Sequence, residues 1–216
     1  MNRHLAFLFI VFAAFFPASK SSSAGDPVLN QLAKLNRIEL ERTAVTLARQ
    51  AVTECVLRRR TIEPPQSLPA VFRKLRAGAF VTVTSKGQPR ACMGTVAPTQ
   101  SNLAHEIIHA AVNAAVNDPW QHPLQKGELK ALQYTVSIIG QPQPLHGLGE
   151  FVVDRDGLMV RQGSRSAVVL PGEAKTASYA LAKARRKAGL KPGEHAQLWR
   201  LPVTRLASEH LKAGSG

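Results

Sequence analysis

The sequence predicts an α+β fold, a single domain with a largely antiparallel β-sheet flanked by α-helices, with or without a small subdomain. The chain has 216 residues and is 44% hydrophobic, which suits one domain with a real core. Helical periodicity dominates the first part of the chain after residue 27, and alternating, strand-like segments dominate the middle. Their order, β–β–α–β–β–β–α–β led by helix, is typical of α+β domains.

The first half contains a helical region and a hairpin. Between residues 28 and 60, apolar side chains recur at spacings of three and four, which predicts one long helix or two joined helices with Cys55 buried. The prolines of Glu63–Pro69 predict a loop. Ala79–Ser85 alternates like a strand, the letters KGQ predict a turn, and Pro89–Ala97 returns as the partner strand.

Two further elements precede the Pro-rich stretch 141–149, which we expect to be linker-like. Ser101–Asp118 is the clearest helix, with Ser101 or Asn102 as its cap. A loop should follow from Trp120, and Ala131–Ile139 has a strong strand pattern.

The last part alternates again between strand and helix. Phe151–Gly163 predicts a hairpin or short β segment around Asp156-Gly157, and Ser166–Pro171 another strand. Lys175–Ala188 predicts a helix that Gly189 closes in the left-handed conformation. Gln197–Leu206 is the last predicted strand.

The N-terminal residues 1–24 have the pattern of a secretory signal peptide. A basic start is followed by the apolar run Leu5–Phe16 and by Pro17, and Ser22 and Ala24 are the small residues that precede a cut. The apolar run is short for a retained membrane anchor. We therefore expect cleavage after Ala24, a domain over residues 25–216 with its core at about 40–206, and a periplasmic or secreted protein.

The chain is strongly basic, with a formal net charge of +14. Removal of Arg3 and Lys20 with the signal peptide leaves +12. The basic residues cluster at Leu57–Arg60 and Lys183–Lys187, near the ends of predicted helices, where cations suit the helix dipole. A solvated surface explains these clusters best. Nucleic acid, anionic lipid or an acidic envelope component are the alternative partners, and no specific nucleic-acid motif accompanies the charge.

The stretch HEIIH, His105–His109, matches the H-E-x-x-H motif with which metalloproteases hold zinc. In that motif the two histidines bind the metal and the glutamate, here Glu106, acts as base rather than ligand. A helical wheel places Glu106 and His109 on the polar arc, as in any solvated face. No third ligand follows at a recognised spacing, so coincidence is the favoured interpretation and a zinc hydrolase the alternative.

A longer pattern resembles the AMMECR-one domain family, also called protein A of the AmmeMemoRadiSam system. The letters RACMGT (Arg90–Thr95) follow a strand and turn, and a helix, DPWQHPL (Asp118–Leu124) and the pair Glu128-Leu129 come next. YTVSII (Tyr134–Ile139) and a Pro-rich exit follow, then DGLMVRQGSRSAVVLP and KARRKAGL. The family's hallmark is an L-R-G-C-I-G stretch, a helix, D-x-R-F-P-P, an E-L and a V-S-V-L strand. The resemblance covers roughly Leu40–Leu206.

The chain departs from this pattern at several positions. Pro89 and Ala91 replace the family's Leu and Gly, residues 120–122 replace its Arg, Phe and Pro, and the segment after Pro171 is shortened. The familiar members are cytosolic and usually lack both histidines of HEIIH. The resemblance implies a multi-component modification pathway with a Memo-like protein and a radical S-adenosylmethionine enzyme. The predicted export, however, weakens the inference of any partner or substrate from cytosolic relatives.

Cys92 is the candidate reactive residue. On an alternating strand, Arg90, Cys92 and Gly94 share one side, and a guanidinium beside a thiol favours the thiolate. Gly94 would let a substrate or another backbone approach the sulfur. His105, His109, Asp118 and His122 follow in sequence and could converge on the thiol. A packed structural cysteine is the alternative; with the family resemblance, a nucleophilic, redox or metal-binding thiol is preferred.

Three functions therefore stay open. The first is an exported AMMECR-one protein centred on Cys92 and Arg90, with Gly94, Asp118 and His122 as binding or loop residues. The second is a zinc hydrolase at HEIIH. The third is a non-catalytic basic binding module, in which Cys55 and Cys92 could form a disulfide.

Overall fold

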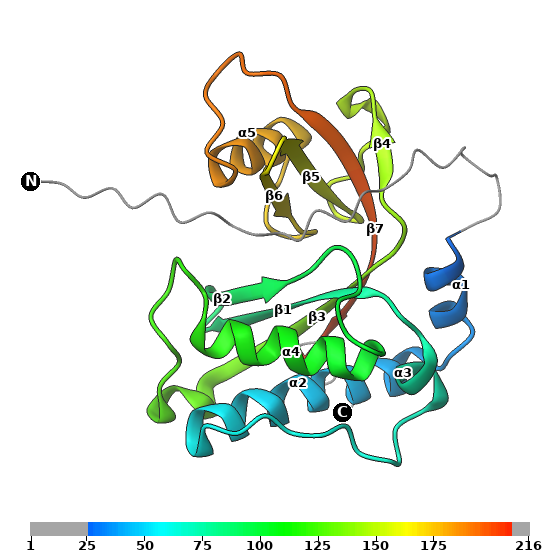
Figure 1. The fold of residues 1–216 in the computed structure, drawn as a ribbon, viewed down its shortest axis with the longest axis vertical. Coiled ribbons are helices and arrows are strands. Elements are labelled where there is room, and N and C mark those ends of the chain that lie inside the picture. Colours follow the sequence, from blue (N-terminus) through cyan, green and yellow to red (C-terminus); the bar gives the residue numbers. More distant parts are fainter. Residues whose placement is uncertain (1–25, 209–216) are drawn as a thin grey trace, which may run out of the picture. The chain divides into compact units, whose positions relative to one another are not determined.

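A computed structural model describes residues 26–208, which form two compact units (Figure 1). The larger unit holds residues 26–141 and 203–208, and the smaller holds Pro142–Pro202. Strand β7 (Gln197–Ala207) gives its first part to the smaller unit and its last part to the larger one. All strand pairs are antiparallel, which confirms the predicted fold class. The signal-peptide prediction lies outside these residues.

The helical region of the larger unit begins with two helices, α1 (Pro27–Ala33) and α2 (Arg37–Arg58). They are separate because Asn36 caps α2: its side chain accepts hydrogen bonds from the backbone N–H groups of Ile38 and Glu39. Helix α2 ends at Arg59, which adopts the left-handed conformation at φ 54°. The short helix α3 (Ala70–Lys74) follows the Pro-rich loop and was not predicted from the sequence.

The sheet of the larger unit has the strand order β2-β1-β3-β7. Strands β1 (Gly78–Ser85) and β2 (Gln88–Gly94) form the predicted hairpin, with Gly87 at φ 76° in the turn, and β3 is Leu132–Ile139. Helix α4 (Leu103–Val116) connects β2 to the segment that leads into β3. Its cap is Asn102, whose side chain accepts from the His105 backbone N–H.

One face of this sheet is apolar and carries the core. Helices α2 and α4 pack against each other and against the strands on that face (Figure 1). Val81, Ala91 and Val136 point into this core. Residues one position away in each strand point to the opposite face, where Thr82, Cys92 and Thr135 stand in register on three neighbouring strands.

The smaller unit is built from β4 (Gln143–Leu145), β5 (Asp156–Gln162), β6 (Arg165–Val169) and α5 (Ala177–Lys187). Strand β7 pairs with β4 and β5, and helix α5 packs on β5 and β6. Asp156-Gly157 begins a strand rather than forming a turn, and the turn lies at Gly163. Strand β4 and the 3-10 turn Leu148–Glu150 occupy the stretch expected to be a linker. Gly189 has φ 67°, as its predicted capping role requires.

No helix between residues 26 and 208 is long and apolar enough to cross a membrane.

Candidate functional site

Cys92 lies on β2, opposite Thr82 of β1, on the sheet face that points away from the helices. The Thr82 hydroxyl oxygen is 3.1 Å from the Cys92 sulfur, and both residues are half-buried. The alternation of the strand explains this placement, because the neighbours Ala91 and Met93 pack against the core. The hairpin register thus gives the Cys92 sulfur a hydroxyl partner, and the residue as a whole stays half-buried.

Asp118 holds the backbone of Cys92 from the outer side of the sheet. Strand β2 is an edge strand, so alternate backbone N–H groups have no strand partner. The Cys92 N–H instead donates to Asp118 Oδ2 at 2.8 Å. The other oxygen, Oδ1, accepts from the backbone N–H of Trp120 at 2.9 Å. One carboxylate therefore joins the cysteine strand to the loop that follows α4.

Arg90 makes a second connection between β2 and that loop. Its guanidinium donates to both carboxylate oxygens of Glu128, at 2.6 and 3.0 Å. It also donates to the backbone oxygens of His122 at 2.9 Å and Pro123 at 3.4 Å. Glu128 lies in the 3-10 turn η1 (Lys126–Ala131), and the hydrogen bond from Arg90 holds its pKa below the ordinary value. The charge of Arg90 is thus offset by Glu128, so its effect on the thiol is weaker than the sequence spacing suggests.

Gly94 and His122 have backbone roles here. A Cβ on Gly94 would collide with the carbonyl oxygen of Ala79 and with Phe80, so the glycine allows β1 to approach closely. The carbonyl oxygen of His122 accepts a hydrogen bond from Arg90, and His122 is otherwise exposed to solvent. Within the described chain, His122 makes no other hydrogen bond.

Glu106 of HEIIH is buried, with 1% of its surface exposed. The helical wheel was therefore wrong to place it on a solvated face. Its carboxylate accepts from the Thr95 hydroxyl at 2.5 Å and from the backbone N–H groups of Thr99 and Gln100 at 2.7 and 2.8 Å. The carboxylate thus accepts the hydrogen bonds of donors in the loop between β2 and α4. The sequence could not reveal this role, because these donors converge only after folding.

The two histidines of HEIIH have separate polar neighbours. His105 Nδ1 is 2.9 Å from the Asn102 side-chain oxygen, and its Nε2 is 3.5 Å from a carboxylate oxygen of Glu63. His109 is exposed and lies 3.1 Å from the Asn113 amide nitrogen. Across residues 26–208, no three His, Cys, Asp or Glu side chains gather as metal ligands would.

Cys55 contrasts with Cys92. It is 6% exposed on α2, as predicted, and burial raises its pKa, although the charge of Arg59 lowers it in part. The two cysteines are not joined by a disulfide. Cys92 is the more accessible of the two.

A family model described as AMMECR1 matches residues 45–210, a range that includes Cys92 and its contacts. The chain belongs to the AMMECR1 family. A protein from Thermotoga maritima is 35% identical over 68% of this chain and 86% of its own length. A protein from Methanothermobacter thermautotrophicus is 35% identical over 70% of this chain and 83% of its own.

A solved structure is also similar to this AMMECR1-family chain. The crystal structure of an uncharacterized protein from Pyrococcus horikoshii superposes with a TM-score of 0.67 at 29% identity. The superposition covers 75% of this chain and 88% of the Pyrococcus horikoshii chain. Together with the family match, this confirms the resemblance that the sequence motifs indicated.

Sequence reasoning missed Thr82 as a neighbour of the thiol and the role of Glu128. Glu128 was visible only as part of a family motif, since 38 positions separate it from Arg90. Thr82 could have been found from the hairpin, because the predicted turn at residues 86–88 sets which residues of the two strands face each other.

Proposed function

We propose that this AMMECR1-family protein acts through the thiol of Cys92. The observation that supports this most strongly is that the Cys92 backbone and sulfur are both held, by Asp118 and by the Thr82 hydroxyl. A reactive cysteine needs a defined position, a polar partner for its sulfur and access to a substrate. The half-buried Cys92 meets these needs, and the buried Cys55 does not.

The polar neighbours suit a thiol that attacks an electrophilic centre. A hydroxyl can donate to a thiolate, and it can also accept from a thiol, so Thr82 is compatible with both forms of Cys92. Asp118 and the Arg90–Glu128 pair hold β2 against the loop at residues 118–128, so the thiol is presented by two connected segments. These contacts make Asp118 and Arg90 positioning residues in our proposal.

We further propose that the protein works outside the cytoplasm, after cleavage behind Ala24, as one component of a modification pathway. A Memo-like protein and a radical S-adenosylmethionine enzyme are the candidate partners that the family implies. The composition of residues 1–24 supports export.

The test compares two cysteine variants in a strain that lacks the gene. Cys92→Ser and Cys55→Ser are each supplied in place of the native protein, and modified metabolites and proteins are profiled by mass spectrometry. We expect Cys92→Ser to reproduce the profile of the deletion strain and Cys55→Ser to restore the native profile. Equal urea-unfolding midpoints for the native protein and Cys92→Ser would show that the fold is intact. Full restoration by a stable Cys92→Ser protein would contradict the proposal.

A third version, lacking residues 2–24, tests the place of action. We expect it to accumulate in the cytoplasm and to leave the deletion profile unchanged. Restoration by this version would contradict export but would leave the role of Cys92 standing.

A further inference from the structure

The hydroxyl of Thr82 has a single hydrogen-bonding neighbour within residues 26–208, the Cys92 sulfur at 3.1 Å. Strand β1 lies between β2 and β3 and pairs with both, so the backbone groups around Thr82 are engaged in the sheet. Threonine is branched at Cβ, which restricts its side chain to few rotamers. The strand itself therefore holds the hydroxyl beside the thiol.

The charged side chains at β2 act on the thiol in opposite directions. The guanidinium of Arg90 favours a thiolate, but the carboxylate of Glu128 binds it at 2.6 and 3.0 Å and offsets its charge. Asp118 Oδ2 accepts from the Cys92 N–H at 2.8 Å, and its negative charge opposes a second negative charge on the same residue. A neutral hydrogen-bond donor stabilises a thiolate independently of these opposing charges, and Thr82 carries such a donor.

We propose that the Thr82 hydroxyl donates a hydrogen bond to the thiolate of Cys92 and thereby raises the fraction of Cys92 that is thiolate at neutral pH. A thiol is a weak donor, whereas a charged acceptor strengthens a hydrogen bond, so the hydroxyl is the donor of the stronger pair. Thr82 contacts the reacting atom itself, while Asp118 and Arg90 act on the strand and the loop. This inference rests on the proposed role of Cys92 and adds the group that activates it.

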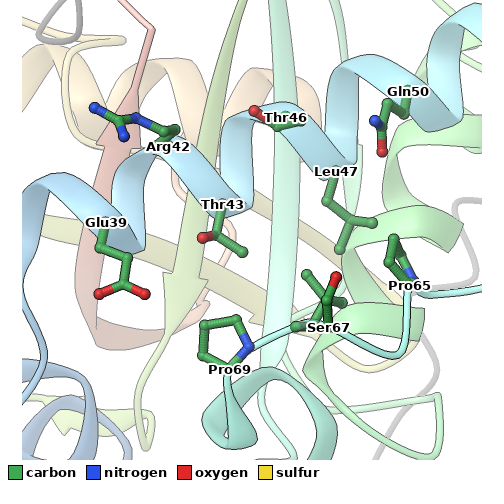
Figure 2. A pocket seen from close by; sticks show the side chains of 10 residues that line it. Glu39, Arg42, Thr43, Thr46, Leu47, Gln50, Pro65, Ser67 and Pro69 are labelled. Atoms are coloured by element: carbon green, nitrogen blue, oxygen red, sulfur yellow. The ribbon is translucent and has the colours of Figure 1, made fainter.

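A groove of the larger unit lies on the other side of the sheet and provides a distant control. Figure 2 shows Thr43 and Leu47 directed from α2 toward the segment Pro65–Pro69. Helix α2 packs on the apolar face of the sheet, whereas Cys92 and Thr82 are on the opposite face. A change at Thr43 therefore alters a threonine of the same unit without reaching the thiol.

The test measures the rate at which iodoacetamide alkylates Cys92 across the pH range, in the purified native protein, Thr82→Val and Thr82→Ser. Valine keeps the shape of threonine and removes the hydroxyl, and serine keeps the hydroxyl. We expect Thr82→Val to react about tenfold more slowly at neutral pH, the scale of one hydrogen bond to a charged group. Its rate should reach half of its maximum about one pH unit higher than in the native protein. Thr82→Ser should react like the native protein.

The rate at high pH separates loss of the hydrogen bond from damage to the site. Where Cys92 is fully thiolate, Thr82→Val should react as fast as the native protein or faster, because a thiolate without a donor is the stronger nucleophile. A Thr82→Val protein that is slower by the same factor at every pH would overturn the proposal, since altered structure or access would then explain the loss.

Two further valine variants are the matched controls, and both should keep the native profile. Thr135 is in register with Thr82 on the same sheet face but lies two strand spacings from Cys92, about 10 Å, and Thr43 lies in the groove. A shift in Thr135→Val as large as that in Thr82→Val would overturn the proposal. So would equal profiles for Thr82→Val and a native protein whose Cys92 reacts fast. A native Cys92 that reacts no faster than Cys55 would instead contradict the proposed function itself.

Discussion

Glu106 accepts hydrogen bonds from three residues of the loop between β2 and α4, and this explains why a carboxylate can be buried there. The donors are the backbone N–H groups of Thr99 and Gln100 and the hydroxyl groups of Thr95 and Thr99. A buried carboxylate is tolerated when several donors surround it. We therefore assign Glu106 a structural role. The HEIIH motif had suggested the role of a catalytic base instead.

Replacement of Glu106 by alanine should destabilise the protein. The loop donors would lose a charged acceptor that lies almost fully buried, and we expect a loss of about 3 kcal/mol in the free energy of unfolding. Urea unfolding followed by circular dichroism measures this loss. His109→Ala on the exposed side of the same helix is the control and should change stability by less than about 0.5 kcal/mol. If Glu106→Ala were as stable as the control, the structural role would be wrong.

At the residue scale, the sequence predicted which residues are candidates for the site, but not which of them contact one another. Cys92 and Asp118 were both recognised as candidates, and the structure joins them through a backbone hydrogen bond. The approach of Glu128 to Arg90, by contrast, depends on the path of the loop after α4. Such a path is set by tertiary packing and leaves little periodic signal in the sequence.

At the scale of elements, the close contact between β1 and β2 at Gly94 has a measurable consequence. Gly94→Ala would place a Cβ against the Ala79 carbonyl and Phe80, which the hairpin can relieve only by separating its strands. We expect a loss of about 2 kcal/mol in the free energy of unfolding. Gly127→Ala is the matched control, because a Cβ there meets no atom within 4 Å. Equal stability of the two variants would show that β1 and β2 do not approach as closely as described.

Glu173 connects helix α5 to β6 and should make the smaller unit sensitive to acid. Its carboxylate lies 2.8 Å from Lys183 and 3.5 Å from Lys187, and it accepts from the Leu170 backbone N–H. Burial raises the pKa of Glu173, but the lysine charges and hydrogen bonds outweigh it, so the folded-state pKa lies below the ordinary value of a glutamate. A carboxyl group whose pKa is lower in the folded state stabilises the fold at pH values above its unfolded-state pKa. This contribution is lost as the pH falls through the folded-state pKa.

The variant Glu173→Gln isolates this contribution. At neutral pH it should be less stable than the native protein by about 2 kcal/mol, because the charged hydrogen bonds are lost. The difference should shrink once the pH drops below the lowered pKa of Glu173, since the native carboxyl is then neutral too. Urea unfolding at pH values from neutral to well below the ordinary pKa of a glutamate tests this, with Glu150→Gln as an exposed control. A difference that stays constant with pH would contradict the assignment.

Most elements were predictable because their patterns are local. The alternation in β1 and β3 and the caps of α4 and α5 follow from neighbouring residues. The short elements α3 and β4 were missed, because five and three residues are too few to show a period. Strand β4 exists through its pairing with β7, more than fifty positions away.

At the scale of the whole molecule, the sequence predicted an antiparallel α+β fold and allowed for a small subdomain. The division between residues 141 and 142 was not predicted. The division depends on β7. The sequence predicts β7 as one ordinary strand, but the strand contributes to both units. The two hydrophobic cores confirm that each unit has its own packing: α2 and α4 cover one core, and α5 covers the other.

The central claim is that Cys92, rather than any other described side chain, is the reactive group of this AMMECR1-family protein. It is tested most directly by alkylation of the native protein with iodoacetamide at about neutral pH, where thiolate fraction and access decide the rate. Mass spectrometry of peptides then follows Cys92 and Cys55 in the same sample. Our account predicts that Cys92 reacts at least about tenfold faster than Cys55, because Cys55 is buried and its pKa is raised. Equal rates, or modification of Cys92 only after unfolding, would contradict it.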